Sequence, residues 1–177
     1  MQLNDSQAEW IKNQVREYIL SQRTHYCRYA RPLKRTEVSA LTGFFPPQIL
    51  KTVRLCFLQG GRIESPAFYE QLRQWGTSNL PCFEQMAAIT LVDVIVSHVP
   101  IDEQLLFHEL VHVAQYRVLG PDEFARRYVR GFLHGGAYEK IPLEMQAYEL
   151  DGRFVLAPEK VFSVEQEIDA WLKEGRL

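Results

Sequence analysis

Apolar residues recur at helical spacing along most of the chain. A capping box at Ser6 and Glu9, followed by apolar residues three or four apart, predicts a first helix over about residues 6–21. A second capping box at Ser163 and Gln166 predicts a last helix near the end of the sequence. Helices in between are predicted over residues 36–41, 66–75, 102–120, 122–133 and 142–152.

Two short segments carry a β pattern instead. Residues 53–57 read as a strand, and residues 87–97 are rich in β-branched side chains, which favour strands. The second segment is either one strand or two short strands folded near Val92-Asp93. The basic and aromatic residues of 23–35 read as a solvated connection. The sum predicts an α+β chain, mostly helical, with a small β element before the helix that starts near Asp102.

Composition narrows the class of protein. With 177 residues and 46% hydrophobic residues, the chain can bury a core as a single domain over residues 1–177, which excludes a mainly disordered protein. A net charge of −2 argues against a nucleic-acid binder. Three scattered cysteines form neither a disulfide framework nor a zinc knuckle. Without a membrane-length apolar run or a signal-peptide pattern at the N-terminus, we expect a cytoplasmic protein with no membrane span.

The chemistry is concentrated in residues 105–116. Residues four apart on a helix lie on one face, so His108 and His112 can direct two imidazoles at one point. Glu109 lies about 100° around the helix and can reach a water at that point. Apolar side chains surround this helix, so it is expected to be buried, and burying these groups unpaired costs several kcal/mol. A metal ion would satisfy all three; the alternative is a core histidine pair held by hydrogen bonds, with Glu109 at the surface.

A catalytic zinc site normally has three protein ligands and one open position. The downstream candidates for the third ligand are His134, Glu139, Glu144, Glu149 and Asp151. We favour Glu144, in the first turn of the helix that Pro142 opens, because a helix is a rigid mount and Ala147 is small enough for close packing. Glu149 is the second choice. The alternative is that Glu144 only interacts favourably with the helix dipole.

The sequence of residues 108–115, His-Glu-Leu-Val-His-Val-Ala-Gln, resembles the zincin metallopeptidases of the gluzincin branch. It is especially similar to an uncharacterised bacterial zincin-like family found in proteins linked to contractile injection systems and in toxin-like proteins. In that family a β segment precedes the motif, and residues 88–95 match it in part. The resemblance covers residues 86–152, a metallopeptidase-like core, whereas residues 1–80 form a helical N-terminal portion of unrecognised origin.

The resemblance implies one zinc ion held by His108, His112 and Glu144, with Glu109 as the catalytic base. It also implies that the strand before the helix can pair with an extended peptide substrate. Two positions depart from the family pattern. Val92 stands near the place of a glycine in the β segment. Many gluzincins carry an aspartate four residues after the glutamate ligand, where this chain has Tyr148; Asp151 can take over that role.

The expected function is therefore zinc-dependent hydrolysis of a peptide or protein substrate. A donor for the oxyanion is also needed, and four residues are candidates: Tyr138, Tyr148, His134 and Tyr116. His98 is expected at the surface or rim. Two alternatives stay open: a non-catalytic zinc-binding or protein-interaction module that retains the site, and a metal-free helical interaction protein that uses Trp10, Trp75 or Trp171 as anchors.

Overall fold

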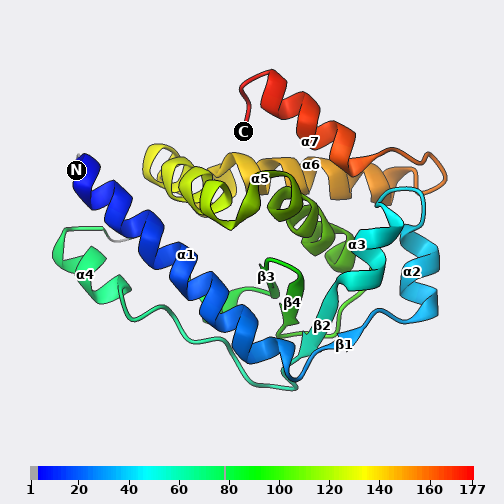
Figure 1. Cartoon of the computed structure of the whole chain (residues 1–177), viewed down its shortest axis with the longest axis horizontal. Helices are drawn as coiled ribbons and strands as arrows, with labels where there is room; N and C mark the ends of the chain where they lie inside the picture. Colours follow the sequence, from blue (N-terminus) through cyan, green and yellow to red (C-terminus); the bar gives the residue numbers. More distant parts are fainter. Residues whose placement is uncertain (1–3, 78) are drawn as a thin grey trace.

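The computed structural model describes residues 4–77 and 79–177. It confirms a mostly helical α+β chain with a small sheet before the long central helix (Figure 1). Residues 1–3 lie outside the described residues. They belong to the N-terminal segment for which the sequence predicts no signal peptide. The elements are α1 (Asp5–Cys27), β1 (Arg31–Pro32), α2 (Arg35–Leu41), α3 (Pro47–Thr52), β2 (Arg54–Phe57), α4 (Tyr69–Gln74), η1 (Phe83–Gln85), β3 (Ala88–Leu91), β4 (Val94–Ser97), α5 (Glu103–Gly135), η2 (Tyr138–Lys140), α6 (Pro142–Leu156) and α7 (Val164–Lys173).

Helix α1 differs from its predicted form at both ends. The capping box predicted at Ser6 and Glu9 is wrong: the backbone N–H of Gln7 donates to the Asn4 side chain, and the Gln7 side chain accepts from the Asn4 N–H. The helix also continues to Cys27, so the first part of the stretch predicted as a connection is helical. Long-range contacts explain the extension, since Arg23 forms two hydrogen bonds, of 2.5 and 2.8 Å, with the Asp93 carboxylate.

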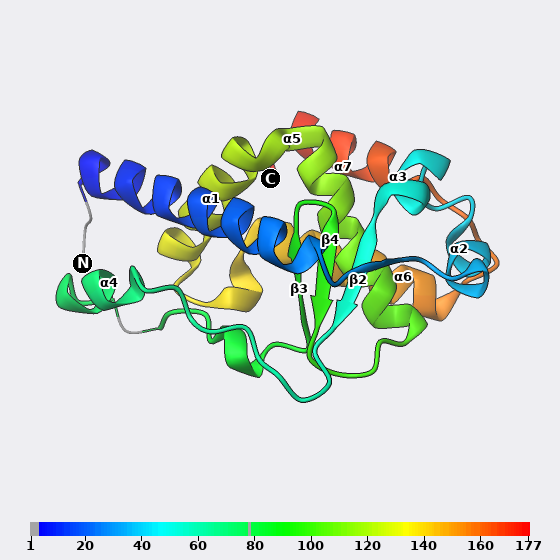
Figure 2. The ribbon, with the colours of Figure 1, turned by 60° about the horizontal axis from the view of Figure 1, so that its bottom comes forward.

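The sheet has the strand order β1-β2-β4-β3. Strands β2 and β4 are parallel, and the other two pairs are antiparallel. Residues 87–97 form two strands that turn at Val92-Asp93, and Val92 adopts a φ of 63°, which favours glycine. Strand β3 lies at the edge, beside β4 (Figure 2). Its outer edge pairs with no other strand among residues 4–77 and 79–177.

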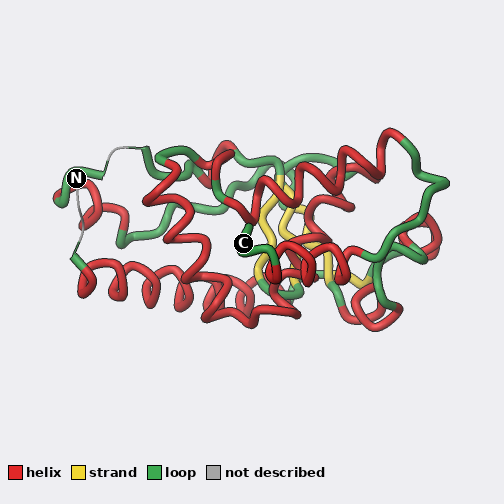
Figure 3. The backbone as a smooth tube through the Cα atoms, turned by 90° about the horizontal axis from the view of Figure 1, so that it is seen from above, coloured by secondary structure: helices red, strands yellow, loops and turns green. Residues whose placement is uncertain are grey.

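The two faces of the sheet are covered by different helices. On one face, Leu55 and Ile95 join the main core with the buried side of α5. On the other face, Cys56 and Val96 form a second cluster against Tyr18 and other residues of α1. Viewed from above, the strands form one small group with helices running alongside (Figure 3). Strand β3 is therefore held between α1 and α5.

The two helices predicted over residues 102–120 and 122–133 are joined as α5, which bends at Gly120. Gly120 has a φ of 73°, and Pro121 follows, so the helical hydrogen bonding is interrupted there. The Asp102 side chain caps the helix by accepting from the Leu105 N–H at 2.8 Å. None of the helices in the described part of the chain combines the length and apolar character needed to cross a bilayer.

Two smaller predictions are corrected. Helix α4 begins at Tyr69 rather than at Pro66. His98 is buried rather than at the surface or rim, with 4% of its surface exposed. Its Nε2 accepts from the Ile63 N–H at 3.1 Å, and its Nδ1 lies 2.7 Å from the carbonyl oxygen of Met86. This histidine thus joins two loops at the end of the β hairpin.

Candidate metal centre

The first half of α5 and the first turn of α6 bring three potential ligands together. His108, His112 and Glu144 are 7%, 6% and 3% exposed, and a ligand atom of each lies within 4.8 Å of the others. The two Nε2 atoms are 3.2 Å apart. Oε2 of Glu144 lies 3.6 Å from the Nε2 of His108 and 3.3 Å from that of His112. This buried group can hold a metal ion.

The far nitrogen of each imidazole faces an acceptor oxygen. Nδ1 of His108 lies 2.7 Å from Oδ2 of Asp151, and Nδ1 of His112 lies 2.8 Å from Oε1 of Gln115. The orientation of the Gln115 amide is fixed, because its NH₂ group donates to the carbonyl of Leu143 and to the side chain of Gln146. Each Nδ1 therefore carries a hydrogen, which leaves each Nε2 as the nitrogen that can bind a metal ion.

This convergence requires a positive charge. Oε2 of Glu144 is buried and has no hydrogen-bond partner among the described residues. Burial alone raises the pKa of Glu144, but His112 and His108 outweigh it and lower the pKa well below its usual range. For His108, burial lowers the pKa, while its contacts with Asp151 and Glu144 outweigh burial and raise the pKa to about 10. Without a metal, a proton must supply the charge that the site requires.

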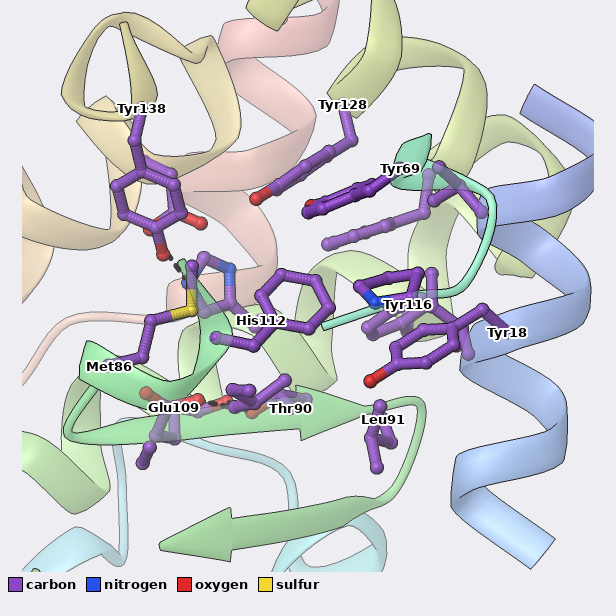
Figure 4. Close-up of a pocket in the computed structure, with 18 of the residues that line it drawn as sticks. Tyr18, Tyr69, Met86, Thr90, Leu91, Glu109, His112, Tyr116, Tyr128 and Tyr138 are labelled. Atoms are coloured by element: carbon purple, nitrogen blue, oxygen red, sulfur yellow. Dashed lines mark hydrogen bonds and ion pairs between the residues drawn. The ribbon is translucent and has the colours of Figure 1, made fainter. Parts of the chain in front are cut away.

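Glu109 lies beside this group on the strand side. It is 4% exposed, and its Oε2 accepts a hydrogen bond of 2.7 Å from the hydroxyl of Thr90 on β3 (Figure 4). The alternative in which Glu109 lies at the surface of the helix is therefore wrong. Its partner is a neutral hydroxyl rather than a cation.

The other residues predicted to support the site lie at different distances from the two histidines and Glu144. Asp151 contacts His108 directly, as described above, and the Tyr148 ring lies 4.7 Å from the His108 ring. Burial, followed by the charge of Glu144, raises the pKa of Tyr138 well above its ordinary value, so this phenol stays neutral. Figure 4 shows the Tyr138 hydroxyl directed towards His112. Tyr116 is buried against Phe124, with ring centroids 3.7 Å apart.

Three candidates are not brought into the group. His134 is exposed near the end of α5, where its Nδ1 lies 2.8 Å from the carbonyl oxygen of Arg130. Glu139 is exposed in η2. Glu149 lies on the exposed side of α6, 3.3 Å from Arg176.

Sequence reasoning missed three polar residues that support the site. Gln115 follows His112 by one helical turn, which is a spacing that could have identified it. Thr90 and Gln146 gave no such signal, because their contacts with Glu109 and Gln115 span 19 and 31 positions. Such contacts depend on which elements pack together.

Comparisons of the chain with protein-family models, with curated proteins and with solved structures find no match. The chemistry of the metal centre is therefore the basis for assigning a function.

Proposed function

We propose that this protein is a zinc-dependent peptidase whose ion is held by His108, His112 and Glu144. The observation that carries the proposal is the convergence of their three ligand atoms. Zinc bonds of 2.0–2.1 Å in tetrahedral geometry separate neighbouring ligand atoms by about 3.3 Å. The separations here are 3.2, 3.3 and 3.6 Å. Two imidazoles and one carboxylate are a donor set of catalytic zinc sites, which keep a fourth position open.

The residues around the ligands fit hydrolysis. A bound zinc ion lowers the pKa of water and polarises a carbonyl group. Glu109 takes the proton from the attacking water and returns it to the leaving amine, with Thr90 holding its carboxylate in place. Tyr138 is neutral and can donate a hydrogen bond to the oxyanion as charge develops on the carbonyl oxygen.

The position of β3 favours a peptide as the substrate. This edge strand carries Thr90 and therefore runs directly beside Glu109. An extended peptide can add to such an edge through main-chain hydrogen bonds, which would align its carbonyl groups with the site. The resemblance of residues 86–152 to zincin-like metallopeptidases agrees with this assignment.

The test combines metal analysis with peptide cleavage. Purified protein is expected to contain one zinc ion per chain and to cleave members of a peptide library. Glu109→Gln should retain zinc and lose about 10²- to 10⁴-fold in kcat, because only the base is removed. His112→Ala should lose both zinc and cleavage.

Three other outcomes would contradict the proposal. Cleavage by Glu109→Gln at the wild-type rate would show that the assigned base is wrong. Stoichiometric zinc without cleavage that depends on Glu109 would identify a non-catalytic zinc-binding module. Protein that takes up no zinc, and that keeps its fold after chelation, would be a metal-free interaction protein.

A further inference from the structure

A partly enclosed pocket lies directly beside the proposed catalytic group. Thr90, Glu109 and His112 line its inner wall, and Glu144 and Tyr138 also reach it (Figure 4). Away from these residues, aliphatic and aromatic side chains form most of the walls. The space inside is about 80 Å³.

Part of the pocket wall comes from residues 1–80, which carry no resemblance to known peptidases. Tyr18 and Ile19 approach from α1, and Phe68 and Tyr69 from the start of α4. Beyond the bend at Gly120, the second half of α5 contributes Phe124 and Tyr128. The N-terminal portion thus closes one side of the site, which gives residues 1–80 a role beyond packing.

The opposite side of the metal group is different. There a larger space of about 580 Å³ lies beside His108, Glu109 and Tyr148. Polar side chains such as Asp102 and Asp151 line it. A peptide lying along β3 would therefore meet a small, mainly apolar pocket on one side of Glu109 and a wider, more polar space on the other.

Size and polarity together define what the pocket can bind. A charged side chain would lose its hydration among these walls, which costs free energy. An acidic one would also be repelled by Glu109 and Glu144. An apolar cavity that encloses a benzene ring measures about 150 Å³, roughly twice the space here. An unbranched or γ-branched aliphatic chain therefore fits better than an aromatic ring.

We propose that this pocket selects a peptide with leucine or methionine next to the bond that is cleaved. The inference rests on the proposed function and adds its substrate class. One methylene group more or fewer in an apolar pocket changes kcat/KM by about 10- to 200-fold. Peptides with leucine or methionine at that position should thus exceed those with glycine or aspartate by at least 10-fold.

The specificity test enlarges the pocket at one wall. Ile19→Ala adds space, so phenylalanine and tryptophan peptides should gain at least 10-fold in kcat/KM relative to leucine peptides. Ile11→Ala is the matched control, because Ile11 is also buried in α1 but does not line this pocket. Glu109-dependent cleavage without an aliphatic preference, or an equal change in both variants, would overturn the inference and leave the proposed function standing.

A binding test does not depend on catalysis or on the fold of the wall variants. Capped tetrapeptides containing leucine, phenylalanine or aspartate are titrated into Glu109→Gln protein and followed by methyl NMR of Ile19 and Leu91. The leucine peptide should shift both methyl signals and bind at least 10-fold more tightly than the aspartate peptide. Equal affinities, or shifts confined to other residues, would overturn the inference even if no cleavage is found.

Discussion

Asp151 lies 2.7 Å from Nδ1 of His108, and the two residues are separated by 43 positions in the chain. Asp151 stands two turns after Glu144 on α6, so one helix supplies both a candidate ligand and the carboxylate that contacts another candidate ligand. In the proposed zinc site, this contact would replace that of the aspartate which many gluzincins carry four residues after the glutamate ligand. Tyr148 occupies that position here, and its ring lies 4.7 Å from the same imidazole at an interplanar angle of 54°.

Asp151→Asn should weaken zinc binding by about 10- to 100-fold, because the amide is a weaker acceptor for Nδ1–H and lowers the basicity of the imidazole. Competition with a chromophoric chelator measures the change. Asp169→Asn, an exposed substitution on α7, serves as the control and should leave the affinity unchanged. Equal affinities of the two variants would show that Asp151 does not act on the metal centre.

Gln115→Met should affect both stability and metal binding. Methionine fills similar space but cannot accept from Nδ1 of His112 or donate to Leu143 and Gln146. Leaving buried polar groups unpaired costs about 1–3 kcal/mol of unfolding free energy each. Zinc affinity should also fall by about 10-fold or more. Urea unfolding and zinc titration test this, with the exposed Gln74→Met as control; an unaltered zinc affinity would refute the orienting role.

Thr90→Val should separate catalysis from metal binding. Valine has the shape of threonine but cannot hold the Glu109 carboxylate. We expect kcat to fall by about 10-fold, corresponding to roughly 1.4 kcal/mol from one lost hydrogen bond, with the zinc content unchanged. Thr90→Ser restores the hydroxyl and should recover most of the activity. A loss of zinc in Thr90→Val, or no recovery in Thr90→Ser, would contradict a positioning role.

Glu84 should make the stability of the fold sensitive to acid. Its own backbone N–H and that of Ser65, followed by the side chains of Cys82 and Ser65, lower the pKa of Glu84 to about 2. A carboxyl group whose pKa is lowered on folding stabilises the folded state at pH values above its ordinary pKa of 4.5. This contribution is lost as the pH falls towards 2. The melting temperature of Glu84→Gln should therefore differ from that of wild type at pH 6 and converge with it near pH 2. A constant difference across this range would show that the Ser65 contacts do not depend on the charge.

Local patterns correctly located much of the fold. The stop signal at Gly120-Pro121 marks the bend in α5, and the Ser163 side chain caps α7 as expected. The boundaries of α1 were harder to predict, because Arg23 is held in the helix by Asp93, which lies 70 positions away. Val92 was also unexpected, since a β-branched residue rarely adopts positive φ without support from its surroundings.

By itself, the sequence determined that two imidazoles share one face of a buried helix, with an acid at the adjoining position. Helical geometry repeats every few residues, so spacing alone fixes that arrangement. Only the tertiary structure decided that Glu144 rather than Glu149 reaches the histidines, that Gln115 and Asp151 orient them, and that α1 closes an apolar pocket beside Glu109. Those contacts follow from how helices and strands pack against one another, and the periodicity of any single segment carries no information about its neighbours in space.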